Sequence, residues 1–121
     1  MSGKLQREKA GNDYPQRGHI YWVKLDPSVG TETKKTRPGL IVSNNTGNKV
    51  SSRVIAAPIT SASKRVYPFE VEIETDGQKS KVMLDQIRVL DKKRLGRKIG
   101  MLSEEKMKEV NKALKLVLSL G

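Results

Sequence analysis

Apolar and acidic residues alternate between positions 69 and 74, where the sequence reads FEVEIE. This alternation is typical of a strand that buries one face, and the Asp76-Gly77 that follows is a hairpin turn signal. Residues 81–84 are therefore expected to form the returning strand. We expect the glutamates of this run to form a solvated face, although a docking stripe for a basic partner stays open.

Shorter apolar runs before this hairpin predict further strands at residues 20–25 (IYWVKL), 39–43 (GLIVS) and 53–59 (RVIAAPI). β-Branched and aromatic residues dominate these runs, and turn-forming residues follow them. Pro58 inside the last run argues for a strand end or an edge, because proline gives no N–H to a ladder. Residues 44–48 carry turn signals, and we interpret residues 91–97 as a helical turn or loop.

The end of the chain predicts one amphipathic helix. Ser103 is a good N-cap, and Glu104 and Glu105 follow in the first turn, where the helix dipole favours acids. Apolar residues then recur at helical spacing, at Met107, Val110, Leu114, Val117 and Leu118. The pattern predicts a helix to about Leu120 with its apolar stripe in the core.

Several short strands followed by one terminal helix predict a mainly β fold with helices (β+α). We expect a small, SH3-like bent antiparallel sheet or barrel with the helix packed against it. Residues 1–16 are polar and aperiodic, which predicts a flexible N-terminal arm. Residues 17–121 are then a single domain of ordinary size.

The charge of the chain indicates which classes of partner it binds. Lys and Arg number 24 against 13 Asp and Glu, giving a net charge of +11, so nucleic acid or an acidic protein is the expected partner. The chain has no cysteine and one histidine, which argues against a metal site, and we expect no cofactor. No long apolar run or signal-peptide-like segment occurs, so we expect a cytoplasmic protein without a membrane partner.

Ordered short motifs resemble the MazF/PemK/Kid family of toxin ribonucleases from bacterial toxin-antitoxin pairs. They lie at residues 17–22 (RGHIYW), 25–27 (LDP), 30–32 (GTE), 37–42 (RPGLIV), 57–61 (APITS), 67–71 (YPFEV) and 84–88 (LDQIR). The resemblance implies a homodimer of SH3-like barrels that cuts single-stranded RNA in a groove at or near the dimer interface. It also implies an acidic antitoxin that blocks this groove.

Metal-free RNA cleavage uses the neighbouring 2′-hydroxyl as the nucleophile, so the protein must take up one proton, neutralise the phosphorane and protonate the leaving oxygen. Arg37 is the first candidate, because its planar guanidinium makes bidentate bonds to phosphate oxygens. The resemblance points to the same residue, and it assigns Thr60 as the catalytic threonine. The hydroxyl of Thr60 can donate to a nonbridging phosphate oxygen.

The general base is left open among three candidates. Glu32 matches an acid common in the family, and Asp85 matches an acid with catalytic or RNA-binding roles in some members. His19 has a suitable pKa for acid-base chemistry, but the histidine of some relatives falls at Thr31 here. We therefore interpret His19 as a strand residue.

Further residues are candidates for contacts with RNA. The segment before Arg37 lacks the glutamine and glycines of relatives and carries lysines instead, which suit phosphate contacts. The candidate RNA-binding residues are Lys34, Lys35, Ser61, Lys64, Arg65, Gln86 and Arg88. Tyr67 and Phe69 can stack on bases, but we expect them to be core residues.

Two alternatives from other classes remain. One is a non-enzymatic toxin of the same fold, similar to the CcdB gyrase poisons, although the ending of the chain lacks the Trp-Gly-Ile of that group. The other is a basic RNA-binding barrel that leaves RNA uncut.

Overall fold

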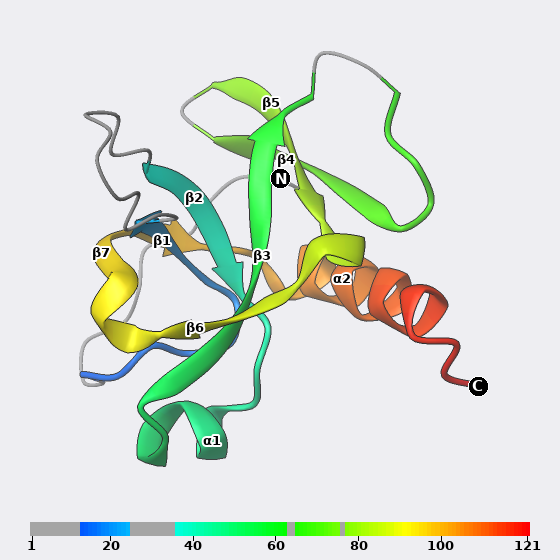
Figure 1. The fold of residues 1–121 in the computed structure, drawn as a ribbon. Helices are drawn as coiled ribbons and strands as arrows, with labels where there is room; N and C mark the ends of the chain where they lie inside the picture. The colour runs from blue at the N-terminus through cyan, green and yellow to red at the C-terminus, as the bar shows by residue number, and fades with distance from the viewer. Residues whose placement is uncertain (1–12, 25–35, 63–64, 76) are drawn as a thin grey trace, which may run out of the picture.

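The computed structural model describes residues 13–24, 36–62, 65–75 and 77–121. Figure 1 shows how the strands and helices of this part of the chain are arranged. The strands are β1 (His19–Lys24), β2 (Thr36–Ile41), β3 (Arg53–Ser61), β4 (Glu70–Thr75), β5 (Gln78–Met83), β6 (Arg88–Asp91) and β7 (Leu95–Met101). The helices are α1 (Asn45–Val50), the 3-10 helices η1 (Leu84–Gln86) and η2 (Lys92–Arg94), and α2 (Glu104–Val117).

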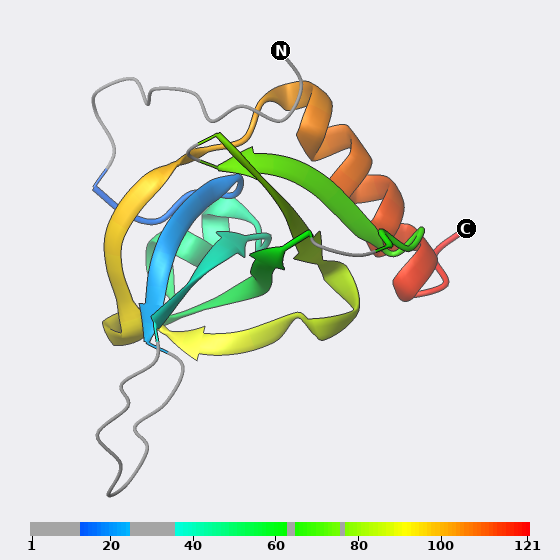
Figure 2. The ribbon, with the colours of Figure 1, turned by 90° about the horizontal axis from the view of Figure 1, so that it is seen from above.

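The described strands form one seven-stranded sheet. Its order is β4-β5-β3-β2-β1-β7, and β6 joins it by pairing with β3. All of these pairings are antiparallel. Seen from above, the sheet curls round on itself and α2 lies along one side (Figure 2). This arrangement confirms the predicted bent antiparallel sheet with a C-terminal helix.

The pairing of β3 explains how the strand accommodates Pro58. Residues 53–56 pair with β6, and residues 59–61 pair with β5. Pro58 lies between these two ladders and pairs with neither β5 nor β6, so β3 tolerates a residue without an N–H on this side. The expectation of a strand end or edge at Pro58 is wrong, because β3 continues to Ser61.

Two clusters of buried apolar residues form the core. The larger cluster includes Val110 and Ala113 of α2, which pack against residues of the sheet. The helix begins as predicted, since Ser103 Oγ accepts a hydrogen bond of 3.1 Å from the backbone N–H of Lys106. Burial of this apolar stripe holds the helix against the sheet.

The end of α2 differs from the prediction. The helix stops at Val117 rather than near Leu120, and Leu118 is exposed instead of joining the core. Ser119 adopts a left-handed backbone conformation with φ of 56°, which ends the helical path. The predicted apolar stripe is therefore correct only as far as Val117, which packs against the larger cluster.

Two segments fold differently from the sequence prediction. Residues 44–48 do not form a simple turn: Asn44 caps the short helix α1, and its side chain accepts a hydrogen bond from the N–H of Gly47. In residues 91–97 the expected helical turn is present as η2, but it is shorter than predicted, because β6 ends at Asp91 and β7 begins at Leu95. Among the described strands, β7 (LGRKIGM) pairs with β1 alone and lies at the end of the sheet. An edge strand accommodates glycines and charged residues, so β7 lacks the alternation of apolar and polar residues that would have predicted a strand.

The predicted hairpin is present, although β5 begins earlier than expected, at Gln78 rather than at position 81. Thr75 pairs with Gln78 across the turn, and Gly77 has φ of 77°, a conformation that glycine tolerates. Asp76, the other residue of the turn signal, lies outside the described residues.

Lysines of β5 face the glutamates of β4. Lys81 Nζ lies 3.0 Å from Glu70 Oε1, and Lys79 Nζ lies 3.9 Å from Glu72 Oε2. The side chain of Glu70 is only 7% exposed, so the expectation of a solvated glutamate face is wrong at this position. The other pair is far more exposed and contributes little to stability.

The predicted flexible arm of residues 1–16 lies mostly outside the described residues, and the described part begins at Asp13. Among the described helices, none is both long and apolar enough to cross a membrane.

Candidate active site

An open groove of about 540 Å³ lies where β2 and β3 separate. The ladder between the two strands joins residues 39–41 to residues 56–58 and goes no further, although both strands continue. Figure 1 shows the strands diverging beyond this ladder. The groove is lined by Thr36, Arg37 and Pro38 of β2, Ile59, Thr60 and Ser61 of β3, and Ser80 of β5.

Arg37 brings positive charge to this groove from β2. Its position is fixed through the other edge of the strand, where Arg37 pairs in register with Val23 of β1. The side chain is exposed, and among the described residues no hydrogen bond or ion pair engages its guanidinium. A guanidinium in this state is available to bind an anion such as a phosphate.

Hydroxyl groups line the same groove as the arginine. Thr60 is half-buried, and Ser61 next to it is exposed. Ser80 is buried, with its Oγ 2.9 Å from the Oγ1 of Thr75. Hydroxyls both donate and accept hydrogen bonds, so this lining suits the nonbridging oxygens of a phosphodiester as well as ribose hydroxyls.

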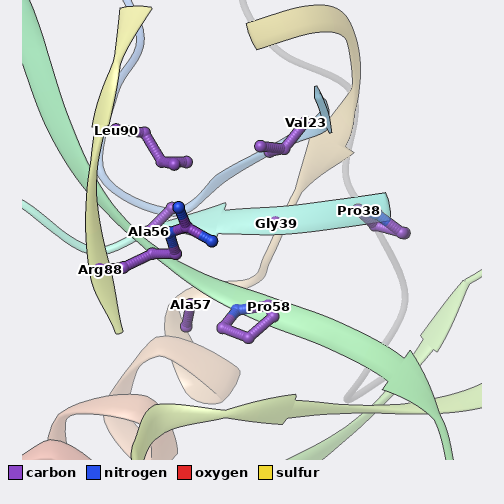
Figure 3. Close-up of a pocket in the computed structure, with 8 residues that line it drawn as sticks. All are labelled: Val23, Pro38, Gly39, Ala56, Ala57, Pro58, Arg88 and Leu90. Carbon is purple, nitrogen blue, oxygen red and sulfur yellow. The ribbon is translucent and has the colours of Figure 1, made fainter. Parts of the chain in front are cut away.

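A smaller apolar hollow adjoins the groove and shares Pro38 with it. Figure 3 shows its lining: Val23, Pro38, Gly39, Ala56, Ala57, Pro58, Arg88 and Leu90. The side chain of Arg88 extends from β6 across β3 toward this hollow (Figure 3). Arg88 therefore lines the neighbouring hollow rather than the groove that contains Arg37.

The remaining candidates from the sequence lie elsewhere. Asp85 and Gln86 are exposed in η1, and neither lines the groove. Arg65 is exposed on the segment between β3 and β4, with its Cζ 5.3 Å from the centre of the Tyr67 ring. Four other candidates lie outside the described residues: Glu32, Lys34, Lys35 and Lys64. Of the predicted residues, the groove thus brings together Arg37, Thr60 and Ser61.

His19 lies away from the groove. Its side chain is buried, its Nδ1 accepts a hydrogen bond of 3.2 Å from the backbone N–H of Gln16, and burial lowers its pKa. It lines a different pocket, between the start of β1 and α2. This placement agrees with the interpretation of His19 as a strand residue.

Arg17 was not singled out by the sequence, and the structure gives it a structural position. Its Nε donates to the carbonyl of Val42 at 2.9 Å, and its Nη2 donates to Asn111 Oδ1 at 2.6 Å. Its backbone N–H also donates to Asn45 Oδ1. Arg17 thereby joins the start of β1 to the end of β2, to α1 and to α2.

Sequence reasoning also missed two polar residues of the groove. Thr36 precedes Arg37 directly, and Ser80 enters from β5 because it is the register partner of Ser61. The strand β5 reads QKSKVM, so Ser80 has polar neighbours on both sides and no local signal marked it. Within the described part of the chain, no group of three His, Cys, Asp or Glu side chains is placed to hold a metal ion.

Fold and groove together define a small basic β-protein whose open groove contains an arginine and several hydroxyl side chains. The sequence profile of PemK-like, MazF-like toxins of type II toxin-antitoxin systems matches residues 16–118. The endoribonuclease MazF of Staphylococcus saprophyticus is 46% identical over 110 residues, which cover 87% of this chain and 92% of that protein. The chain therefore belongs to the family of PemK-like, MazF-like toxins and is a homologue of the endoribonuclease MazF.

Solved structures agree with this assignment. A MazE-MazF structure from Deinococcus radiodurans contains a chain with a TM-score of 0.77 and 30% identity, covering 91% of this chain and 100% of that one. An endoribonuclease in complex with its cognate antitoxin, from a mycobacterial species, has a TM-score of 0.76 and 30% identity. This second match covers 88% of the present chain and 97% of the mycobacterial one.

Proposed function

We propose that this toxin cleaves single-stranded RNA, messenger RNA in particular, by attack of a ribose 2′-hydroxyl and without a metal ion. The observation that carries the proposal is the presence of Arg37 and Thr60 in one open groove of a chain with a net charge of +11. A field of this sign draws a polyanion to the groove. The guanidinium and the hydroxyl supply donors for the oxygens of one phosphate.

In the proposed reaction, the 2′-oxygen forms a bond to phosphorus while its proton passes to a base. The bond from phosphorus to the 5′-oxygen breaks, which leaves a 2′,3′-cyclic phosphate and a 5′-hydroxyl end. Arg37 neutralises the charge on the phosphorane and gives a proton to the leaving 5′-oxygen, regaining it from solvent. Thr60 donates a hydrogen bond to a nonbridging oxygen.

Two carboxylates are the candidate bases. Glu32 belongs to the segment that leads into Thr36, and Asp85 is exposed in the first turn of η1. The amide variants Glu32→Gln and Asp85→Asn distinguish them. Only the variant that lacks the base should lose the dependence of cleavage rate on carboxylate ionisation.

We further propose that the RNA extends beyond the groove over other polar and basic residues. These residues are Lys34, Lys35, Ser61, Lys64, Arg65, Gln86 and Arg88. We propose that the toxin is a homodimer and that an acidic antitoxin neutralises it by covering this surface. A mycobacterial relative was solved with its cognate antitoxin, and a chain with a net charge of +11 is complementary to an acidic partner.

The decisive experiment incubates the purified chain with a long single-stranded RNA in excess EDTA. We expect discrete cuts, mapped by primer extension, whose products carry 5′-hydroxyl and 2′,3′-cyclic phosphate ends. DNA of the same sequence should bind but stay intact, because it lacks the nucleophile. Intact RNA would contradict the proposal: growth arrest without cutting would indicate a gyrase-poison-like toxin, and salt-sensitive binding alone an RNA-binding barrel.

A further inference from the structure

An exposed aromatic stack lies on the segment between β3 and β4, away from the groove. The ring of Tyr67 lies parallel to that of Phe69, with an interplanar angle of 2° and 5.5 Å between ring centres. Tyr67 is 43% exposed, and Phe69 is half-buried beneath it. The expectation that Tyr67 is a core residue is therefore wrong.

The stack is held in place by a nearly buried ion pair. Glu70 Oε1 accepts hydrogen bonds from the backbone N–H of Tyr67 and from Lys81 Nζ, each 3.0 Å long. Lys81 Nζ also donates to the carbonyl of Arg65 at 3.1 Å. The side chains of Lys81 and Glu70 are only 13% and 7% exposed. The ring of Tyr67 is thus presented to solvent by a rigid support, which lowers the entropic cost of stacking a ligand on it.

Two basic side chains lie over the ring of Tyr67. The Arg65 guanidinium carbon lies 5.3 Å from the ring centre, and Lys81 Nζ lies 5.9 Å from it. An aromatic ring beside basic groups is the combination with which proteins bind single-stranded nucleic acid, since the ring stacks on a base while the cations attract the phosphates. An apolar protein segment would gain nothing from these cations.

The stack is connected to the groove through one strand. Lys81 of β5 is the register partner of Thr60 of β3, so the two side chains project from the same face of the sheet. Neighbouring strands lie about 5 Å apart. An RNA strand that enters the groove and crosses β5 at Lys81 therefore reaches Tyr67 within a few nucleotides of the scissile phosphate.

We infer that Tyr67 is a stacking platform for one unpaired nucleobase of the bound RNA, near the phosphodiester bond that is cleaved in the groove containing Arg37. This inference rests on the proposed function. It adds a contact at the RNA-binding surface that recognises a base through its flat face, and such a contact tolerates different bases.

The test uses a short RNA that contains a mapped cleavage site and carries a 2′-O-methyl group on the nucleotide that supplies the nucleophile. This RNA binds without being cut. We expect Tyr67→Ala to weaken its binding about tenfold or more, whereas Tyr67→Phe binds like the original chain. Tyr67→Leu keeps apolar volume without a ring and should behave like the alanine variant. Thermal unfolding of each variant checks that the fold is intact.

A second arm identifies the base. Single abasic substitutions along the same RNA should reveal one position at which removing the base weakens binding to the original chain. Removing the same base should not weaken binding to Tyr67→Ala. Unchanged RNA binding by Tyr67→Ala, or full rescue by Tyr67→Leu, overturns the platform. A Tyr67→Ala variant that weakens antitoxin binding alone also overturns it. Failure of the original chain to cut unmodified RNA in EDTA instead refutes the proposed function.

Discussion

Gly39 of β2 and Pro58 of β3 are register partners and form the last pair of the ladder that joins these strands before the groove opens. Arg37 precedes Gly39 by two positions, and Thr60 follows Pro58 by two positions. Because side chains alternate along a strand, the two residues lie at equivalent places beyond the ladder, one on each strand. The arginine and the threonine are thus positioned by backbone pairing, Arg37 with Val23 of β1 and Thr60 with Lys81 of β5.

Replacing Arg37 tests the phosphate contact. We expect Arg37→Ala to lower kcat about 100- to 1000-fold, the loss typical of removing one preorganised donor to a developing negative charge. Arg37→Lys keeps the charge but loses the bidentate geometry, so it should recover only part of the rate. Arg97→Ala, at an exposed arginine of β7, is the matched control and should cleave normally. Equal rates in the Arg37 and Arg97 variants would refute the assignment.

Replacing Thr60 tests the hydroxyl separately from the shape of the strand. Thr60→Val keeps the β-branched side chain and should lower kcat by about tenfold, the effect of one hydrogen bond to a charged group. Thr60→Ser keeps the hydroxyl and should stay close to the original rate. Rapid-quench cleavage of a short RNA measures both variants. A serine variant as slow as the valine variant would assign Thr60 to packing.

Gly39 leaves no room for a side chain. A Cβ at this position would lie 2.9 Å from Val23 Cγ2, beneath the hollow beside the groove. We expect Gly39→Ala to destabilise the fold by about 1–3 kcal/mol through overpacking. The urea midpoint measures this change, with Gly121→Ala as the control, because nothing lies within 4 Å of a Cβ built there. Similar midpoints for the two variants would show that Val23 moves aside without cost.

Because His19 is buried, we expect the free energy of unfolding to depend on pH. Burial lowers the pKa of His19 below its ordinary value of 6.5, so below that pH the unfolded chain binds a proton that the folded chain excludes. This contribution to stability is complete above pH 6.5 and is lost progressively as the pH falls toward the folded-state pKa. Urea midpoints measured on both sides of pH 6.5 follow it.

The matched variant for this measurement is His19→Asn, whose side-chain oxygen can replace Nδ1 as the acceptor for the N–H of Gln16. Its stability should fall less steeply with decreasing pH than that of the original chain. The same slope in both proteins would mean that other groups carry the pH dependence.

The sequence predicts the parts of this molecule whose patterns are local. The alternation over residues 69–74 and the capped helix after Ser103 led to correct elements, because period and capping depend on neighbouring residues only. The edge strand β7 escaped prediction, since an edge tolerates polar residues and leaves no clear alternation.

The residues of the candidate site also include some that the sequence predicts and some that it does not. Arg37 and Thr60 were found through motifs, and the structure places both in one groove. Ser80 was missed because only the pairing of β3 with β5 brings it there. The exposure of Tyr67 was missed because an aromatic residue on a connecting segment has the same composition signal as one in the core.

The groove is open because β2 and β3 diverge beyond their ladder. The residues that line it are therefore part of the sheet itself. Residues 65–69 lie outside its lining, so this segment can be exchanged for another without moving Arg37 or Thr60. If the toxin cleaves messenger RNA as proposed, redesign of such segments should change which messages it binds while Arg37 and Thr60 keep their places in the sheet.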